Sequence, residues 1–218
     1  MPMLTFAEEI LLLALDDQNG KIKPLPPQAL RYALVGALLT ELALLDRIDT
    51  DLDALKVINT EPTGDELLDL VLERLASSRT ECGTTYWLTE LAWHMRDLQD
   101  HVLQQLVNKS VLKIEDRKIL WVFAVRRYPL MDDREVKEVK SRLRELIMSD
   151  NIPDPREAVL VSLVSACQLF DEIFTPEELN RLRPRIAELA KLDLIGREVS
   201  RSINEISLAV AASMPAMM

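Results

Sequence analysis

The histidines and cysteines are the residues of this sequence that could hold a metal or act as nucleophiles. His94 and His101 lie seven positions apart on a predicted helix, so they share a face but are separated by two turns. Zinc ligands on a helix are typically one turn apart with further ligands nearby, and neither Cys82 nor Cys167 is close in sequence. The sequence has no glycine-rich phosphate loop and no recognisable nucleophile motif. We therefore expect no enzyme, no metal site and no cofactor.

A basic segment between residues 117 and 144 suggests a different chemistry. It holds nine basic and four acidic residues, whereas residues 41–81 hold four basic and eleven acidic ones. Apolar residues adjoin two arginines in this segment, namely Ile119, Leu120, Trp121, Phe123, Arg126 and Arg127. Basic residues beside exposed apolar ones suit an anionic membrane surface or an acidic partner. The alternative is that the basic residues after 133 alternate with acids on a solvated helix face.

The overall composition limits the possible functions further. The 36 acidic and 26 basic residues give a net charge of -10, which argues against general nucleic-acid binding. A hydrophobic content of 48% over 218 residues is enough for a sizeable core. Two cysteines fit a reducing compartment, and neither a signal peptide nor a membrane span is evident. We expect a cytoplasmic protein.

The elements that must position these residues are organised around residues 29–45. Leucines recur there at helical spacing and alanines fill much of the remaining circumference, the residues being Leu30, Leu34, Leu38, Leu42, Leu45, Ala33, Ala37 and Ala43. A helix that is apolar nearly all round is buried. This run is shorter than the roughly 20 residues of a membrane span and contains Arg31 and Glu41. The sequence predicts a mainly α protein, a single domain over 1–218 around this buried helix.

Capping signals predict where the surrounding helices begin. A capping box, with a glutamate three positions after the cap, occurs at Thr5, Thr63, Asp154 and Thr175. We expect helices over 8–15, 67–76, 86–108, 133–149, 155–172, 176–191 and 194–212, with Pro26 and Pro27 in the first turn of the central helix. Residues 47–49 and 57–59 are candidates for a pair of short strands.

Residues 109–126 change from helical to strand periodicity. The apolar runs 111–114 and 119–123 flank the polar residues 115–118, which predicts a β-hairpin with its turn at the polar residues. A helix, a longer helix and a hairpin are also the order of a winged-helix DNA-binding domain. The acidic residues Glu90, Asp97 and Asp100 on the longer helix oppose phosphate contact. We therefore expect no nucleic-acid partner.

Several segments together resemble the Golgi phosphoprotein 3 family over nearly the whole chain. In order, they are residues 8–16, 40–44, 56–58, 62–65 with 67–69, 106–112 and 123–130. Their order and spacing carry the specificity, rather than any single piece. The likeness begins almost at Met1, without the basic extension typical of eukaryotic members, so the chain is most similar to a bacterial-type member.

The resemblance implies a mostly helical peripheral membrane adaptor rather than an enzyme. Eukaryotic members bind phosphatidylinositol 4-phosphate and sort Golgi glycosyltransferases by their cytosolic tails, so an anionic lipid and such tails are the implied partners. A hairpin used in membrane contact and oligomerisation falls at about residues 115–126. The residues implied for it are Glu115, Lys118, Leu120, Trp121, Phe123, Arg126 and Arg127.

The lipid pocket of the family uses a tryptophan and three arginines. The resemblance puts Pro26 at the tryptophan position and Val35 and Gln99 at two arginine positions, and it retains the third arginine as Arg96. Arg31, one turn before Val35, is a candidate replacement charge. The resemblance thus implies a degenerate headgroup pocket with weak, less selective binding of an anionic lipid. Self-association through the hairpin without lipid is the alternative.

Overall fold

The elements of the chain are given by a computed structural model that describes residues 4–17, 19–50, 54–78, 82–119 and 123–213. Side chains are described throughout these ranges except at 116–119, 123–125, 207 and 209–213. The helices are α1 (Phe6–Ala14), α2 (Ala29–Leu44), α3 (Glu66–Ser77), α4 (Thr84–His94), α5 (Leu98–Asn108), α6 (Arg134–Met148), α7 (Pro155–Ala166), α8 (Pro176–Leu189) and α9 (Leu194–Ser213), with a 3-10 turn at Leu169–Glu172. The strands are β1 (Ile48–Thr50), β2 (Leu55–Val57), β3 (Glu115–Ile119) and β4 (Phe123–Arg127).

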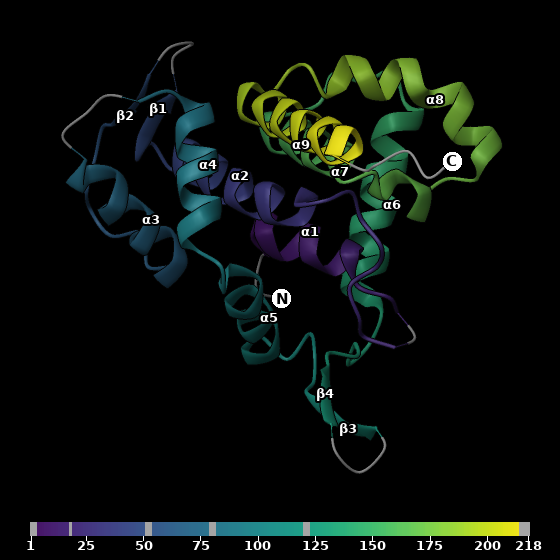
Figure 1. The fold of residues 1–218 in the computed structure, drawn as a ribbon. Coiled ribbons are helices and arrows are strands. Elements are labelled where there is room, and N and C mark those ends of the chain that lie inside the picture. The colour runs from purple at the N-terminus through teal and green to yellow at the C-terminus, as the bar shows by residue number, and fades with distance from the viewer. Residues whose placement is uncertain (1–3, 18, 51–53, 79–81, 120–122, 214–218) are drawn as a thin grey trace.

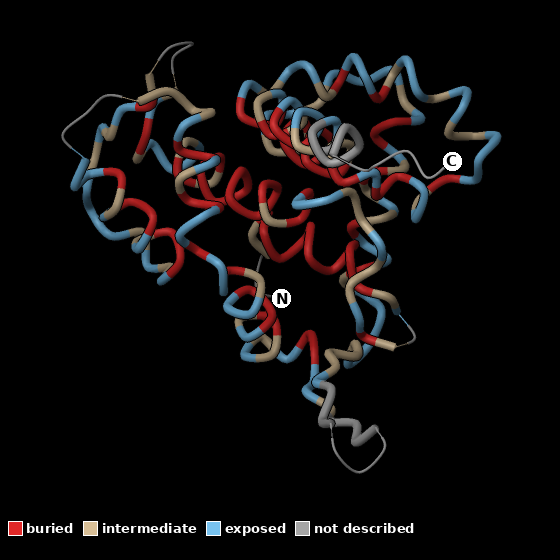
Figure 2. Tube along the Cα trace, viewed as in Figure 1, coloured by how far each residue is buried: buried red, intermediate tan, exposed pale blue. Residues whose placement is uncertain are grey.

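Helix α2 is the centre of the fold, as the sequence predicts. It packs against α1, α3, α4, α7 and α9, and Figure 2 shows α1 and α2 as a buried pair through the middle of the molecule. The prediction of a mainly α protein around a buried helix is confirmed. The predicted first turn at Pro26 and Pro27 is wrong, because Gln28 has a positive φ of 62° and the helix begins at Ala29. Pro26 and Pro27 form the turn before it.

Three of the four predicted capping boxes are confirmed, at Thr5, Asp154 and Thr175. The box at Thr63 is wrong, because Asp65 caps α3 by accepting from the amides of Leu67 and Leu68. The hydroxyl of Thr63 instead donates to Asp69 over 2.7 Å. The chain turns between Thr63 and the helix at Gly64, where φ is +88°, so the extended residue next to the helix is Asp65.

The predicted helix over 86–108 is two helices. Helix α4 ends at His94 and α5 begins at Leu98, after a turn in which Met95 stays buried. The break redirects the chain, so that α4 packs on α2 while α5 packs mainly on α1 and also contacts α2. The predicted helix over 155–172 likewise ends early, because Gln168 has a positive φ of 58° before the 3-10 turn.

Both predicted strand pairs form, but the second has a different register. Strands β1 and β2 pair antiparallel with Ile48 opposite Val57. Strands β3 and β4 pair Glu115 with Arg127 and Ile119 with Phe123, so the predicted turn at 115–118 is wrong. Opposite charges face each other across the start of the ladder, which lets the polar residues lie in a strand. The same register continues at the bridge between Leu112 and Leu130, and Figure 1 shows the hairpin extending away from the helices.

None of the helices in the described ranges is both long enough and apolar enough to cross a bilayer.

Candidate ligand groove at the base of the hairpin

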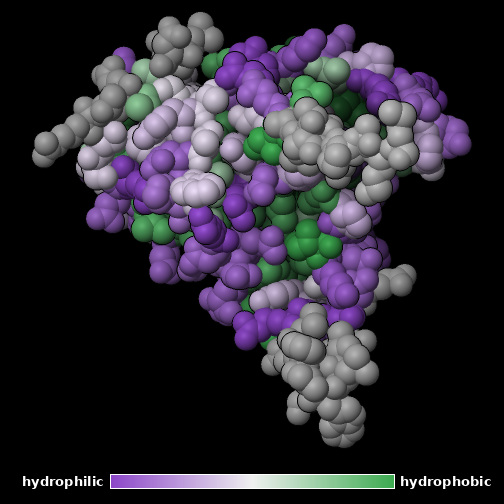
Figure 3. Space-filling model, viewed as in Figure 1, coloured by the Kyte–Doolittle hydropathy of each residue, from purple (hydrophilic) through white to green (hydrophobic). Residues whose placement is uncertain are grey.

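A groove of about 920 Å³ lies between α5, the loop from α1 to α2 and the end of β4. The α5 wall is lined by Asp97, Gln99, Asp100, His101, Leu103 and Gln104. The opposite wall is lined by Leu15, Gly20, Lys21, Ile22, Arg126 and Tyr128. Figure 3 shows that the surface around α5 and the base of the hairpin is mostly hydrophilic. The groove therefore joins segments that are far apart in sequence beside the projecting hairpin.

The turn at Gly20 fixes the second wall. Gly20 has φ +61°, its N–H donates to the Asp16 carbonyl, and its own carbonyl accepts the Tyr128 N–H over 3.1 Å. A Cβ at Gly20 would lie 2.5 Å from the backbone of Tyr128 and Pro129. Only glycine lets the loop approach the hairpin base this closely, so the turn at 16–20 is also a docking point for the hairpin.

The two walls carry opposite charge. Lys21 and Arg126 lie on the loop and strand side, whereas Asp97 and Asp100 lie on α5. Asp97 is 3.6 Å from the His101 ring. Within the described part of the chain, no hydrogen bond or ion pair engages the Lys21 ammonium or the Asp100 carboxylate. The groove is thus of mixed charge rather than uniformly basic.

The residues that the resemblance assigns to a lipid pocket are spread over several places. Gln99 lines the groove, but Val35 is 0% exposed in the core and presents no side chain to a ligand. Pro26 lies in the turn before α2 and Arg31 in its first turn, both partly buried and outside the groove lining. Arg96 is exposed between α4 and α5, with its guanidinium 4.8 Å from the ring centroid of Trp93.

The hairpin residues are described to different extents. Arg126 is exposed and lines the groove, and Arg127 is half-buried. Glu115 pairs with Lys113 over 2.9 Å. For Lys118 and Phe123 only the backbone is described, and Leu120 and Trp121 lie outside the described residues.

The basic residues of helix α6, which lies within the 117–144 segment, are each paired with an acidic residue. Lys137 pairs with Asp133 and Arg134 with Asp132, both over 2.6 Å. The remaining pairs, to other elements, are Lys140 with Asp17, Arg142 with Glu9 and Arg144 with Glu178. The hydrogen bond from Arg144 lowers the pKa of Glu178 to about 2. The local basic excess seen in the sequence is therefore largely compensated on α6.

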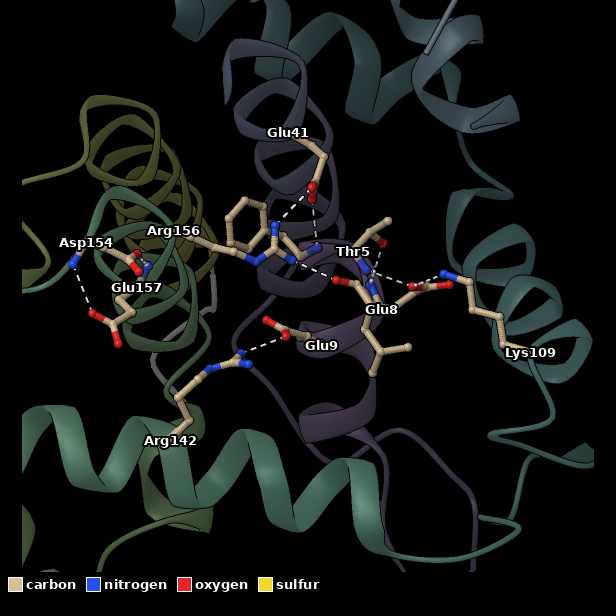
Figure 4. A network of polar contacts seen from close by, with 11 residues as sticks. Thr5, Glu8, Glu9, Glu41, Lys109, Arg142, Asp154, Arg156 and Glu157 are labelled. Carbon is tan, nitrogen blue, oxygen red and sulfur yellow. Dashed lines mark hydrogen bonds and ion pairs between the residues drawn. The ribbon is translucent and has the colours of Figure 1, made fainter. Parts of the chain in front are cut away.

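A second polar cluster, the α1 network, lies inside the molecule (Figure 4). Glu8 is 0% exposed and bonds Lys109 of α5 over 2.6 Å, and Glu9 bonds Arg142 of α6 over 2.7 Å. Burial raises the pKa of Glu9, and Arg142 opposes that shift. The network ties the middle of α1 to two helices.

The same network fixes the start of α1. Arg156 of α7 bonds Glu41 over 3.0 Å and stacks 4.1 Å from the centroid of the Phe6 ring. Glu41 in turn accepts the Phe6 N–H over 3.0 Å. The sequence reveals the capping role of Glu8 but not these long-range partners. Among the residues whose structure is described, no group of three or more potential ligands could hold a metal ion.

A family model and several curated relatives match most of the chain. The family model described as Golgi phosphoprotein 3 (GPP34) matches residues 6–206. The vacuolar protein sorting-associated protein 74 of Eremothecium gossypii is 28% identical over 69% of this chain and 51% of its own length. The protein of the same name from Schizosaccharomyces pombe is 24% identical over 70% of this chain and 52% of its own.

A VPS74-like protein of Dictyostelium discoideum is 23% identical over 95% of this chain and 88% of its own length. The chain thus spans about half the length of the two fungal relatives and most of the length of the third. Since the family model covers nearly all of the fold described above, the chain belongs to the Golgi phosphoprotein 3 family.

Proposed function

We propose that this protein is a peripheral membrane adaptor that attaches through the end of the β3–β4 hairpin. The observation that carries the proposal is the projection of the hairpin beyond the helices (Figure 1), with its strands ending at Ile119 and Phe123. The sequence between these strand ends is Leu120, Trp121 and Val122. Apolar and aromatic residues of this kind are suited to the interface of a bilayer.

Electrostatics would add a weaker contribution to attachment. The α6 cations are paired with acids, and two of the three arginine positions of the family pocket hold Val35 and Gln99. Each missing charge-assisted phosphate contact forgoes about 1.5–3 kcal/mol. We therefore propose a modest preference for anionic lipid, with Arg96 contributing, and little selectivity for phosphatidylinositol 4-phosphate.

Family membership supports the adaptor role. The family is named for a Golgi phosphoprotein and the fungal relatives for vacuolar protein sorting. The cargo we propose is the cytosolic tails of membrane proteins, held at the cytoplasmic surface of a membrane, with no catalytic step.

Vesicle flotation tests the attachment. Vesicles of phosphatidylcholine alone would be compared with vesicles containing phosphatidylserine or, at equal charge, phosphatidylinositol 4-phosphate. We expect more flotation with either anionic lipid, a similar amount with both, and loss of most of it in Trp121→Glu. The matched control is Ile152→Glu, which adds the same charge at a residue 91% exposed outside the hairpin. Equal flotation of Trp121→Glu and the unchanged protein would refute the proposal.

Self-association through the same hairpin is a second candidate. A two-stranded sheet leaves both strand edges open, and open edges pair readily with another chain. This candidate requires an oligomer in lipid-free solution that Trp121→Glu converts to a monomer. Sedimentation at high protein concentration decides it, since a monomer there excludes this candidate and leaves membrane attachment standing.

A further inference from the structure

We propose that the groove between α5 and the hairpin base binds a phosphoethanolamine group, a phosphodiester linked through two carbons to a primary ammonium. The role of such a site in headgroup recognition rests on the membrane attachment proposed above. The charges, volume and position of the groove support binding of this ligand independently of that attachment.

The charges favour a zwitterion. Lys21 stands on the loop wall and Asp100 on the α5 wall, and neither has an ion-pair partner in the part of the chain that the structure describes. No ion pair joins the two across the groove. A ligand with a negative phosphate at one end and a positive ammonium at the other would meet an opposite charge on each wall.

The α5 wall disfavours ligands that carry only negative charge. Asp97 and Asp100 both line that wall, so a phosphate monoester or an inositol phosphate would face two carboxylates opposite the two cations Lys21 and Arg126. The neutral amides of Gln99 and Gln104 are nearby donors for ester oxygens. A singly charged phosphodiester can therefore approach Lys21 while its amine turns toward Asp100.

The ammonium is expected to be primary rather than quaternary. A primary ammonium has three N–H donors for carboxylate oxygens, whereas a trimethylammonium has none and is usually held by a cage of aromatic rings. Among the described residues that line the groove, the aromatic rings are those of Tyr128 and His101, which do not make a cage. The carboxylates of α5 therefore match ethanolamine better than choline.

The dimensions and position also fit a lipid headgroup. A volume of about 920 Å³ is at the upper end of typical ligand sites, so a headgroup with its glycerol fits. Leu15 and Leu103 are 1% and 2% exposed and provide an apolar floor. The groove lies beside the base of the hairpin that is proposed to enter the membrane.

Binding of short-chain lipids below their micelle concentration tests the groove without a bilayer. The titrants, followed by NMR on the intact protein, are dihexanoyl-phosphatidylethanolamine, dihexanoyl-phosphatidylcholine, glycerophosphoethanolamine and inorganic phosphate. We expect the ethanolamine lipid to bind tightest, with inorganic phosphate far weaker. Tighter binding of the lipid than of glycerophosphoethanolamine identifies a membrane as the source, and equal binding identifies a soluble phosphodiester; both support the groove.

Charge-removing variants assign the two ends of the ligand. We expect Asp100→Asn to weaken binding of the ethanolamine lipid about three- to fivefold and to leave binding of the choline lipid unchanged. We expect Lys21→Gln to weaken binding of both lipids by a similar factor. The matched controls Asp150→Asn and Lys191→Gln remove the same charges at exposed residues outside the groove lining and should change neither.

Three results would overturn the groove proposal: no binding, equal binding of the two lipids in all variants, or phosphate binding as tightly as the ethanolamine lipid. Trp121→Glu separates this outcome from that of the proposed attachment. This variant should lose most of its flotation and keep its binding of the soluble lipid. If the unchanged protein floats but does not bind the soluble lipid, only the groove proposal is refuted.

Discussion

The α1 network and the groove are built from the same residue types but differ in how their charges are buried and paired. In the network, Glu8 and Glu9 are almost fully buried and bonded to Lys109 and Arg142 over 2.6 and 2.7 Å. In the groove, Lys21 and Asp100 are exposed, and no described residue pairs with either side chain. Buried charges must be paired, whereas exposed charges of a cavity can be left for a ligand. Burial therefore requires the charges of the network to be paired, whereas exposed charges are paired on α6 and left without a described partner in the groove.

The largest effect is expected from removing a partner of the network. Lys109→Met leaves the Glu8 carboxylate buried without its cation, and we expect a loss of about 3–5 kcal/mol in the free energy of unfolding. Denaturant unfolding measures this loss. The control is Lys113→Met, whose pair with Glu115 has side chains 50% and 38% exposed and should cost less than about 1 kcal/mol. Equal losses in the two variants would refute the distinction between paired buried and paired exposed charges.

A smaller effect is expected from Gly20→Ala, which acts on the wall of the groove. The added Cβ would meet backbone atoms 2.5 Å away at a φ of +61°, so we expect a loss of about 2–4 kcal/mol. Gly64→Ala serves as control, since Gly64 also has a positive φ but has no atom within 4 Å of the added Cβ. It should cost only about 1–2 kcal/mol, and a cost as high as that of Gly20→Ala would show that close approach to the hairpin base is unimportant. Thermal unfolding compares the two.

The smallest effect is on the pH dependence of stability, in which the more exposed pair of Glu178 with Arg144 differs from the more buried pair of Glu9 with Arg142. The pKa of Glu178 is lowered from 4.5 to about 2 by Arg144, so its contribution to stability is present above about pH 4.5 and is lost as pH falls through about 2. Burial raises the pKa of Glu9, so its contribution has the opposite sign and is lost as pH rises through the folded-state pKa.

We expect Glu178→Gln to remove part of the acid destabilisation between about pH 4.5 and 2, measured by unfolding at a series of pH values. Glu177→Gln changes the neighbouring exposed residue in the same first turn of α8 and is the control. If the free energy of unfolding falls between about pH 4.5 and 2 as much in Glu178→Gln as in the unchanged protein, the pair of Glu178 with Arg144 does not cause that fall.

Local patterns predicted much of the fold. The burial of α2 follows from its apolar circumference, and the caps at Thr5, Asp154 and Thr175 follow from a spacing of three residues. What could not be predicted depends on tertiary contacts. The helical period continues through Met95, yet the chain breaks there, and α5 then packs mainly on α1 whereas α4 packs on α2.

The groove was less predictable than the fold. Gln99 and Arg126 were identified from the resemblance, but the sequence does not indicate that they line the same cavity. Lys21, Asp100 and Tyr128 were missed, since each lies in an ordinary turn, helix or strand end. The one available signal is Gly20 beside Lys21, and a glycine there indicates a turn without indicating what the turn packs against. The pairing of the α6 cations was also hidden, because Glu9 and Glu178 are distant in sequence.

The central claim, that the hairpin end enters the membrane, is tested most directly by tryptophan fluorescence with brominated lipids. In a Trp93→Phe background Trp87 is only 5% exposed, so Trp121 is the tryptophan available for quenching by lipid. We predict a blue shift on vesicle binding and strong quenching when the lipid chains carry bromine. Vesicle-bound protein whose emission is neither shifted nor quenched would contradict the claim.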